Sequence, residues 1–362
     1  MKAIGYVNLK KLEKIENKLN LDGIILASKS ELIDPNIQYY TNFVQEEGLG
    51  DCIVVIRNCE RTVFLKEEPE QKIDAEEIII SSKFKEAFKK EFKNLKNVGI
   101  NSSYLKYSAA MFLRKKLKLK LLDVSSELLE IRAIKLKKEI QIFKKAFKFT
   151  NSLIDFIESY IIPKILEGIS ERQIALMIED WCKKRSLETS FKTLVGTGKR
   201  SAQIHTNPSS SLKKAGKIGY IDFGVRYKGY HTDVTLPFAL RKLNRKEEKI
   251  VETLISAYQE ILDRIKVGIY DFEIFETANH YLRKFGLEMK HGVGHGIGLE
   301  VHEFPSFLPK KGRRKIMKIS NGMVFTIEPG IYLKNFGFRI EDDFLVKKNK
   351  IIPMTNSHFI FR

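Results

Sequence analysis

The sequence has few cysteines, no long apolar run and, in its first 200 residues, no histidine. The three cysteines (Cys52, Cys59 and Cys182) form no C-x-x-C pair, which is typical of free thiols in a reducing compartment. The first residues lack the apolar core of a signal peptide, and no stretch reaches the roughly 18 uncharged apolar residues that a membrane span needs. We therefore expect a cytoplasmic protein with no membrane partner.

Acidic residues are also in deficit, because 45 Asp and Glu face 64 Lys and Arg and the formal net charge is +19. Such a balance is typical of nucleic-acid-binding proteins when the basic residues cluster. Here they are spread along the chain. In Lys116–Leu121, for example, lysine and leucine alternate as in a strand with one exposed face, where lysines protect a sheet edge. We expect a lysine-rich surface and no nucleic-acid partner.

A length of 362 residues predicts two domains. Residues 1–127 alternate helices with short apolar strands, which predicts an α/β domain. Its expected strands include Gly23–Ala27, Cys52–Ile56 and Arg61–Leu65, and Asn36–Phe43 is expected to be a loop or strand. Residues 128–362 combine helices, two of them with capping signatures at Ser170 and Asn244, with antiparallel strands, which predicts an α+β domain.

The stretch His291–Glu303, HGVGHGIGLEVHE, contains three of the seven histidines, His291, His295 and His302. Glycine occupies positions 292, 294, 296 and 298, and it allows strained backbone angles and the close approach of other groups. Imidazole is a common metal ligand and proton carrier. The stretch therefore predicts a functional site; the alternative is a glycine-rich turn with incidental histidines.

Two pairs of acidic residues accompany these histidines. Asp222 lies in an expected strand over residues 218–224 and Asp233 in another over residues 230–236. A two-residue turn at Tyr227-Lys228 would place the two aspartates opposite each other, where like charges destabilise a sheet unless a cation or a shared proton is present. Glu328 follows the expected strand Val324–Ile327, and Glu341, thirteen residues later, lies in the expected strand Phe338–Val346. An even-length loop between the two strands would place this pair on one face as well, although Pro329-Gly330 interrupts the ladder just after Glu328.

Four carboxylates and an imidazole are too many negative ligands for a single zinc ion, which prefers four ligands rich in nitrogen and sulfur. Oxygen-rich ligation suits Mn²⁺, Mg²⁺ or Co²⁺ better. Four carboxylates also balance two divalent cations roughly 3.5–4 Å apart, an arrangement that lowers the pKa of water and polarises a carbonyl group. This chemistry is the hydrolysis of an amide or ester.

The order and the amino-acid sequences of these motifs resemble those of the pita-bread metallopeptidases, a family that includes methionine aminopeptidase, Xaa-Pro aminopeptidase and prolidase. The resemblance covers residues 136–362 and rests on IDFG, GYHTDVT, HGVGHGIGLEVHE, TIEPGIY and RIEDD. It implies two divalent metal ions, often Mn²⁺ with Co²⁺ or Zn²⁺ possible, bound by Asp222, Asp233, His295, Glu328 and Glu341. In the family pattern Asp222 chelates one ion, Asp233 and Glu341 bridge, and His295 and Glu328 complete the other. In the same family pattern, the glutamate at the position of Glu328 also transfers the proton of the attacking water.

The proline-specific branch of this family is favoured by residues around the five expected ligands. His205, His291 and His302 match histidines that contact the substrate carbonyl and carry protons, and Arg339 matches an arginine that holds a metal-ligating aspartate. The segments IQYYTNF and ELLEIRAIKLKKEI resemble the creatinase-type N-terminal domain. The resemblance thus implies a creatinase-like α/β domain over 1–127, a pita-bread α+β catalytic domain over 128–362, and a homodimer.

We therefore predict a Xaa-Pro aminopeptidase, which removes the first residue of peptides with proline in second position. The alternative is a Xaa-Pro dipeptidase (prolidase), which is restricted to dipeptides. A catalytically silent binding protein of the same fold and a metal-free amidinohydrolase like creatinase are disfavoured, since all five ligand residues are present. A methionine aminopeptidase is disfavoured by the N-terminal domain. His231 and His280 receive no role, and His358 is expected to be structural.

Overall fold

The computed structural model describes residues 4–29, 32–44, 51–91, 93–211, 213–312 and 314–362. By their internal contacts the residues form two compact units, Met1–Ile131 and Arg132–Arg362. The boundary expected between residues 127 and 128 falls within helix α5 (Ser125–Ala133). Within the described ranges, no helix has the length and apolar character needed to cross a membrane.

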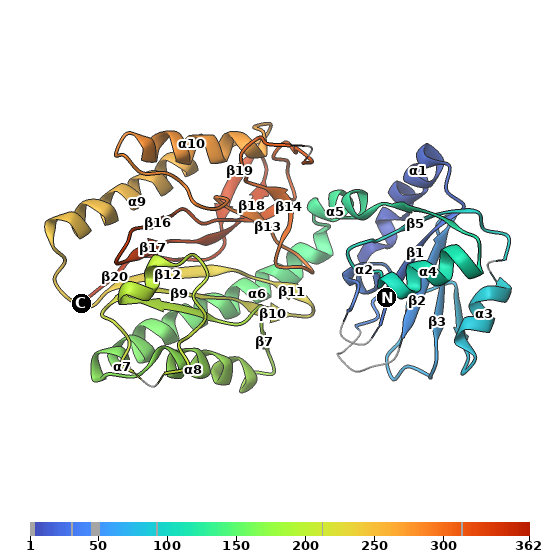
Figure 1. The fold of residues 1–362 in the computed structure, drawn as a ribbon, viewed down its shortest axis with the longest axis horizontal. Coiled ribbons are helices and arrows are strands. Elements are labelled where there is room, and N and C mark those ends of the chain that lie inside the picture. The colour runs from blue at the N-terminus through green and yellow to red at the C-terminus, as the bar shows by residue number, and fades with distance from the viewer. Residues whose placement is uncertain (1–3, 30–31, 45–50, 92, 212, 313) are drawn as a thin grey trace. The chain divides into compact units, whose positions relative to one another are not determined.

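The first unit is built on a six-stranded sheet with the strand order β4-β3-β2-β1-β5-β6 (Figure 1). The sheet is mixed, because β1 pairs antiparallel with β2 and parallel with β5. Its strands are β1 (Gly23–Ser28), β2 (Cys52–Arg57), β3 (Glu60–Leu65), β4 (Glu77–Ile80), β5 (Asn97–Ile100) and β6 (Lys120–Asp123). The helices are α1 (Leu9–Leu19), α2 (Pro35–Thr41), α3 (Phe84–Glu91) and α4 (Tyr107–Lys116), with a 3₁₀ turn at Ile4–Asn8.

Two local predictions in this unit are wrong. The segment expected to be a loop or strand forms α2, because Asp34 caps it by accepting a hydrogen bond from the Asn36 N–H (2.9 Å) and Pro35 occupies the first helical turn. Of the strand expected over Lys116–Leu121, only Lys120 and Leu121 lie in β6, since α4 continues to Lys116.

The second unit places its strands between two groups of helices (Figure 1). Helices α6 (Lys137–Phe156), α7 (Ile162–Glu167) and α8 (Glu171–Lys183) lie on one side, and α9 (Arg245–Arg264) and α10 (Asp271–Arg283) on the other. A π-helical turn at Ile157–Ile161 joins α6 to α7, and a 3₁₀ turn spans Gly198–Ala202. The predicted caps of α8 and α9 are confirmed: Ser170 accepts from the Gln173 N–H (3.3 Å) and Asn244 from the Glu247 N–H (3.0 Å).

Two sheets form the centre of this unit. One has the order β20-β12-β9-β8 and the other β14-β13-β15-β18-β19; shorter ladders are β11-β10-β7 and β16-β17. The strands are β7 (Glu188–Thr189), β8 (Leu194–Thr197), β9 (Ile218–Phe223), β10 (Val225–Tyr227), β11 (Tyr230–His231), β12 (Val234–Ala239), β13 (His295–Gly296), β14 (Glu303–Ser306), β15 (Val324–Ile327), β16 (Gly330–Tyr332), β17 (Gly337–Arg339), β18 (Asp342–Lys347), β19 (Lys350–Pro353) and β20 (Ile360–Phe361).

Each sheet buries apolar side chains against one group of helices. Ile174 and Ile178 of α8 pack in the same core as Ile221 of β9. Leu254 of α9 packs in a second core with Phe325 of β15. Because each fully buried large apolar side chain contributes about 1.5–3 kcal/mol, these two cores fix the sheets that position the acidic residues.

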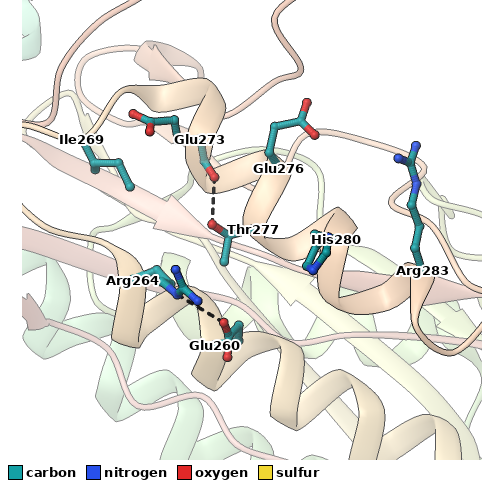
Figure 2. A pocket seen from close by; sticks show the side chains of 8 residues that line it. All are labelled: Glu260, Arg264, Ile269, Glu273, Glu276, Thr277, His280 and Arg283. Carbon is teal, nitrogen blue, oxygen red and sulfur yellow. Dashed lines mark hydrogen bonds and ion pairs between the residues drawn. The ribbon is translucent and has the colours of Figure 1, made fainter.

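A surface cavity of about 550 Å³ lies between α9 and α10 (Figure 2). It is lined by Glu260, Arg264, Ile269, Glu273, Glu276, Thr277, His280 and Arg283. The Arg264 and Glu260 side chains form an ion pair of 3.3 Å on consecutive turns of α9. None of the five expected metal ligands lines this cavity, and its histidine, His280, is exposed.

Candidate metal centre

The hairpin that carries Asp222 and Asp233 is two residues out of the predicted register. Asp222 of β9 lies opposite Thr235 of β12, so the prediction that it faces Asp233 directly is wrong. The turn lies at Lys228-Gly229 rather than at Tyr227-Lys228, and both turn residues have positive φ (51° and 82°), as a two-residue type I′ turn requires. A shift by an even number preserves the alternation of faces. Asp222 is accordingly close enough to raise the pKa of Asp233.

Glu328 and Glu341 lie on a second hairpin, as their odd separation predicted. β15 pairs with β18 with Ile327 opposite Asp342, and β16 pairs with β17 with Gly330 opposite Arg339. The Ile340 N–H donates to the Pro329 carbonyl (3.3 Å), so one register runs through both ladders and sets Glu328 opposite Glu341. The strand expected over Phe338–Val346 is divided here into β17 and β18.

His295 belongs to β13, which lies between β14 and β15. A Cβ atom on the next residue, Gly296, would overlap the carbonyl oxygen of Phe304, so the close pairing with β14 requires glycine at this position. The His295 N–H donates to Thr326 Oγ1 (3.1 Å). The ring Nδ1 lies 3.1 Å from the Gly296 carbonyl oxygen, which assigns the proton to Nδ1 and leaves Nε2 as an electron-pair donor.

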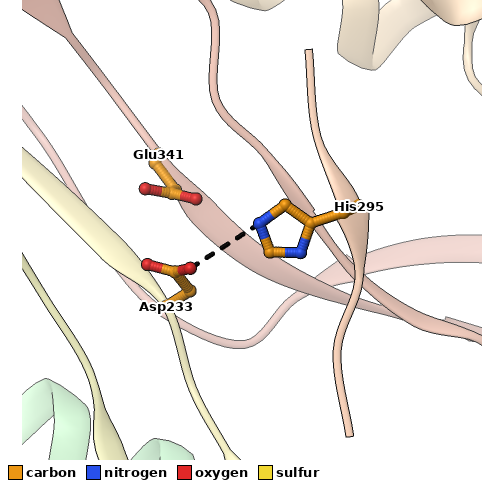
Figure 3. A group of neighbouring side chains, drawn as sticks. All are labelled: Asp233, His295 and Glu341. Carbon is orange, nitrogen blue, oxygen red and sulfur yellow. Dashed lines mark ion pairs between the residues drawn. The ribbon is translucent and has the colours of Figure 1, made fainter. Parts of the chain in front are cut away.

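The two hairpins and β13 bring their functional side chains together (Figure 3). One ligand atom each from Asp233, His295 and Glu341 lies within 4.8 Å of the other two. His295 Nε2 is 3.7 Å from Asp233 Oδ2 and 3.6 Å from Glu328 Oε1. The imidazole therefore points at carboxylates from both hairpins, at a spacing that a cation between them would fit.

The electrostatics of this cluster also fit a divalent cation. Burial raises the pKa of Asp233 and of Glu341 well above the usual values, and the neighbouring carboxylates raise both further. Burial raises the pKa of Glu328 to about 8 and lowers that of His295 to about 3. Asp222 Oδ1 and Asp233 Oδ1 are buried without a hydrogen-bond partner among the described residues. Buried charges of one sign at this spacing require counter-charges, and neutral imidazole and carboxylate oxygens are the donors that bind metal ions.

Arg339 connects the cluster to His291. Its Nη2 pairs with Asp222 Oδ2, its Nε donates to Thr235 Oγ1 (3.0 Å), and Nη1 donates to the hydroxyl of Tyr332 (2.9 Å). The same hydroxyl lies 3.1 Å from His291 Nε2. His291 Nδ1 in turn lies 3.7 Å from Glu328 Oε2. A continuous polar chain thus runs from Asp222 to Glu328.

The other histidines differ in their distance from the centre. The His302 ring is exposed, with its centroid 4.3 Å from that of His295. His205 is exposed and interacts electrostatically with both Asp222 and His302. His231 is buried beside the β13–β14 segment, where its backbone N–H donates to the Gly298 carbonyl (2.9 Å). His358 pairs with Glu158 (3.4 Å), which suits the structural role expected for it.

Sequence reasoning did not single out Tyr332 or Thr235 for a role. Thr235 donates its hydroxyl hydrogen bond to Glu341 Oε2 (2.6 Å) while it accepts from Arg339. The sequence did contain a signal for Thr235, because a residue two places after Asp233 in a strand lies on the same face as Asp233. Tyr332 gave no comparable signal, because its hydroxyl meets Arg339 and His291 only through the hairpin and the sheet.

Comparison with known proteins gives consistent matches along the chain. Residues 141–348 match Metallopeptidase family M24, and residues 8–134 match the Creatinase/Prolidase N-terminal domain. The chain is 30% identical to the Xaa-Pro dipeptidase of Pyrococcus horikoshii, with 94% of each chain covered. It is 28% identical to the Xaa-Pro dipeptidase of Pyrococcus furiosus, with 96% of this chain and 97% of that one covered.

Solved structures agree with these matches. The prolidase from Pyrococcus horikoshii OT3 has a TM-score of 0.84 and 28% sequence identity, over 97% of this chain and 98% of that chain. The predicted fold, a creatinase-like α/β domain followed by a pita-bread catalytic domain, is confirmed.

Proposed function

The chain belongs to metallopeptidase family M24, and on this premise we propose that it is a two-metal exopeptidase that cleaves Xaa-Pro bonds, with Xaa-Pro dipeptides as its preferred substrates. The prediction of a metal-dependent hydrolase is confirmed by the family match. The observation that carries the rest of the proposal is the convergence of His295 with buried carboxylates from two hairpins.

The proposed ligands are Asp222, Asp233, His295, Glu328 and Glu341. The two hairpins and β13 would supply these five side chains to the ions. The oxygen-rich set favours Mn²⁺, with Co²⁺ and Zn²⁺ as alternatives. Ions bound there lower the pKa of a water molecule and polarise the carbonyl group of the scissile bond.

Glu328 and the neighbouring histidines are proposed to move protons during turnover. Glu328 Oε1 faces His295 and Oε2 faces His291, so this carboxylate can bind a metal and accept a proton on different oxygen atoms. His302 and His205 are exposed beside the centre, which suits them to contact a substrate carbonyl. Arg339 holds Asp222 in place through their ion pair.

The choice between the two proline-specific activities follows the relatives. The sequence alone favoured the aminopeptidase and kept the dipeptidase as the alternative. Both Pyrococcus relatives, which cover nearly the whole chain, are named Xaa-Pro dipeptidases, so the dipeptidase is proposed first. A homodimer and a cytoplasmic location remain proposals; the thiols Cys52, Cys59 and Cys182 are free, which fits a reducing compartment.

Hydrolysis of three peptides by metal-stripped protein, with and without added Mn²⁺, tests the activity. Mn²⁺-dependent cleavage of Ala-Pro, with Ala-Pro-Ala-Ala left intact, is the expected result. Release of alanine from both would establish the aminopeptidase, and cleavage of Met-Ala-Ser alone would move the chain to methionine aminopeptidases. No cleavage of any peptide by protein with bound metal would refute the peptidase.

A further inference from the structure

A buried ion cluster lies at the end of the glycine-rich segment that carries His295 and His302. We call it the Glu303 cluster; it consists of Glu303, Glu300, Arg132 and Lys135. Glu303 Oε1 lies 2.9 Å from Arg132 Nη2, and Oε2 lies 2.6 Å from Lys135 Nζ. The side chains of Glu303, Arg132 and Lys135 are each 1% exposed or less. Arg132 Nη2 also pairs with Glu300, so two cations and two carboxylates balance.

The cluster is costly to bury and must therefore be held by the fold around it. Burial alone would raise the pKa of Glu303, but Arg132 and Lys135 hold it below its usual value, so the carboxylate stays charged. Lys135 donates a further hydrogen bond to the Arg132 carbonyl (2.9 Å), and the Lys135 N–H donates to the Gly322 carbonyl (2.8 Å). The two cations thus form a fixed receptor for the carboxylate.

Glu303 in turn organises the segment from His295 to His302. Its Oε1 accepts a hydrogen bond from the Glu300 N–H (3.2 Å). A Cβ atom on Gly298 would overlap the Glu303 carboxylate, so this carboxylate fills the space where residue 298 would have a side chain. Gly298 N–H donates to the Glu300 carbonyl (3.0 Å), which closes a tight turn against the carboxylate. Glu303 is also the backbone partner of Gly296, the residue after His295.

We propose that Glu303, held by Arg132 and Lys135, is a positioning residue that fixes the segment 295–303 and thereby sets His302 against His295 at the metal centre. The inference rests on the proposed function for its catalytic consequence. The short spacing between the His295 and His302 rings, 4.3 Å between centroids, depends on a segment that contains two glycines between them, Gly296 and Gly298, and would otherwise be flexible. The Glu303 carboxylate therefore restrains a segment that its glycines would leave flexible.

The test is the variant Glu303→Gln in wild-type and His302→Ala backgrounds. In the wild-type background kcat for Ala-Pro falls about tenfold or more, while KM and the affinity for Mn²⁺ change little, because losses of this size follow removal of groups that orient a site. In the His302→Ala background the same substitution has little further effect, since the two residues act as one unit. An equal loss in both backgrounds, or no loss in kcat, would overturn the proposal.

A second readout does not depend on activity. Amide hydrogen exchange over residues 295–303 of the metal-stripped protein becomes at least about tenfold faster in Glu303→Gln, while β9 and β12 keep their protection. The matched control is Glu247→Gln, which removes another buried carboxylate paired with arginine (2.7 Å to Arg241) at the start of α9 and leaves both kcat and exchange over 295–303 unchanged. Unchanged exchange over 295–303 in Glu303→Gln would refute the positioning role.

Lys135→Met covers the case in which Glu303→Gln fails to fold, because Glu303 then keeps Arg132 as its partner. Lys135→Met should show a smaller fall in kcat for Ala-Pro and a smaller increase in amide exchange over residues 295–303. If neither variant folds, the cluster serves folding alone and the proposal is overturned. If the wild-type chain cleaves no Xaa-Pro peptide but exchange responds as expected, the proposed function fails and the ordering of 295–303 stands. If hydrolysis is found and neither kcat nor exchange responds, the inference fails alone.

Discussion

Asp222 forms an ion pair with Arg339, whereas Asp233, Glu328 and Glu341 form no ion pair with a lysine or arginine among the described residues. The imidazoles beside Glu328 and Asp233 do not supply charge near neutral pH, because burial lowers the pKa of His291 and of His295 to about 3. Asp233, Glu328 and Glu341 therefore depend on bound cations or on protons. This is the physical reason to expect two divalent ions rather than one.

Tyr332→Phe tests the polar chain between Asp222 and His291. The substitution removes a buried hydroxyl that accepts from Arg339 and contacts His291, and it leaves the ring in place. We expect kcat/KM for Ala-Pro to fall about tenfold, the size of one lost hydrogen bond to a charged group, with Mn²⁺ affinity unchanged. The control is Tyr258→Phe on α9. It loses a hydroxyl group that is hydrogen-bonded to Asp342 of β18 (2.8 Å), and it should keep full activity. If kcat/KM of Tyr332→Phe equalled that of the wild type, the polar chain between Asp222 and His291 would have no role in turnover.

At the scale of elements, the two hairpins show what the sequence could and could not predict. Alternation along strands led from the sequence to the two acidic pairs, whereas the full set of five proposed ligands, with His295, came from the resemblance to the pita-bread metallopeptidases. The register of the Asp222 hairpin was wrong by two residues, since Lys228-Gly229 adopts a type I′ turn without the Asn-Gly pair that marks one. Helix α2 was missed although Asp34 and Pro35 form a recognisable helix start. Tyr332 depends on contacts across the fold that no local pattern reports.

Gly296→Ala tests the close pairing of β13 with β14. The added Cβ would overlap the Phe304 carbonyl oxygen, so the strands must separate and His295 must move. We expect a loss of about 1–3 kcal/mol in unfolding free energy, as for overpacked interiors, and a fall in Mn²⁺ affinity. Chemical denaturation and metal titration measure the two effects.

Gly268→Ala is the matched control for this variant. Gly268 has a φ of +93° and open space at its Cβ position, so alanine is strained there but displaces nothing. Its cost should appear in stability alone, at about 1 kcal/mol. If Gly296→Ala also kept full Mn²⁺ affinity, β13 geometry would not control the ligand position of His295.

At the scale of the whole molecule, the crowded carboxylates make stability depend on pH in the absence of metal. The pKa of Glu328 is raised from 4.5 to about 8, so its contribution to stability is present below pH 4.5 and is lost as the pH rises through 8. The pKa values of Asp233 and Glu341 are raised in the same direction. His291 and His295 act oppositely, but only below pH 6.5, where the unfolded chain binds protons that the folded chain does not.

The melting temperature of metal-stripped protein should therefore fall between pH 6.5 and 8.5, and added Mn²⁺ should remove the fall because cations replace the protons. Each unit of pKa shift corresponds to about 1.4 kcal/mol, so the change is measurable by calorimetry. Glu328→Gln should show a shallower fall. A melting temperature of the metal-stripped wild type that stays level over this range would show that the carboxylates are not held together without metal.

Titration of metal-stripped protein with Mn²⁺, followed by calorimetry and by hydrolysis of Ala-Pro in the same samples, tests the two-metal centre most directly. We predict that about two ions bind per chain, that hydrolysis appears as they bind, and that Asp233→Asn loses both. Retention of two bound ions by Asp233→Asn, or hydrolysis of Ala-Pro by wild-type protein free of metal, would contradict the account.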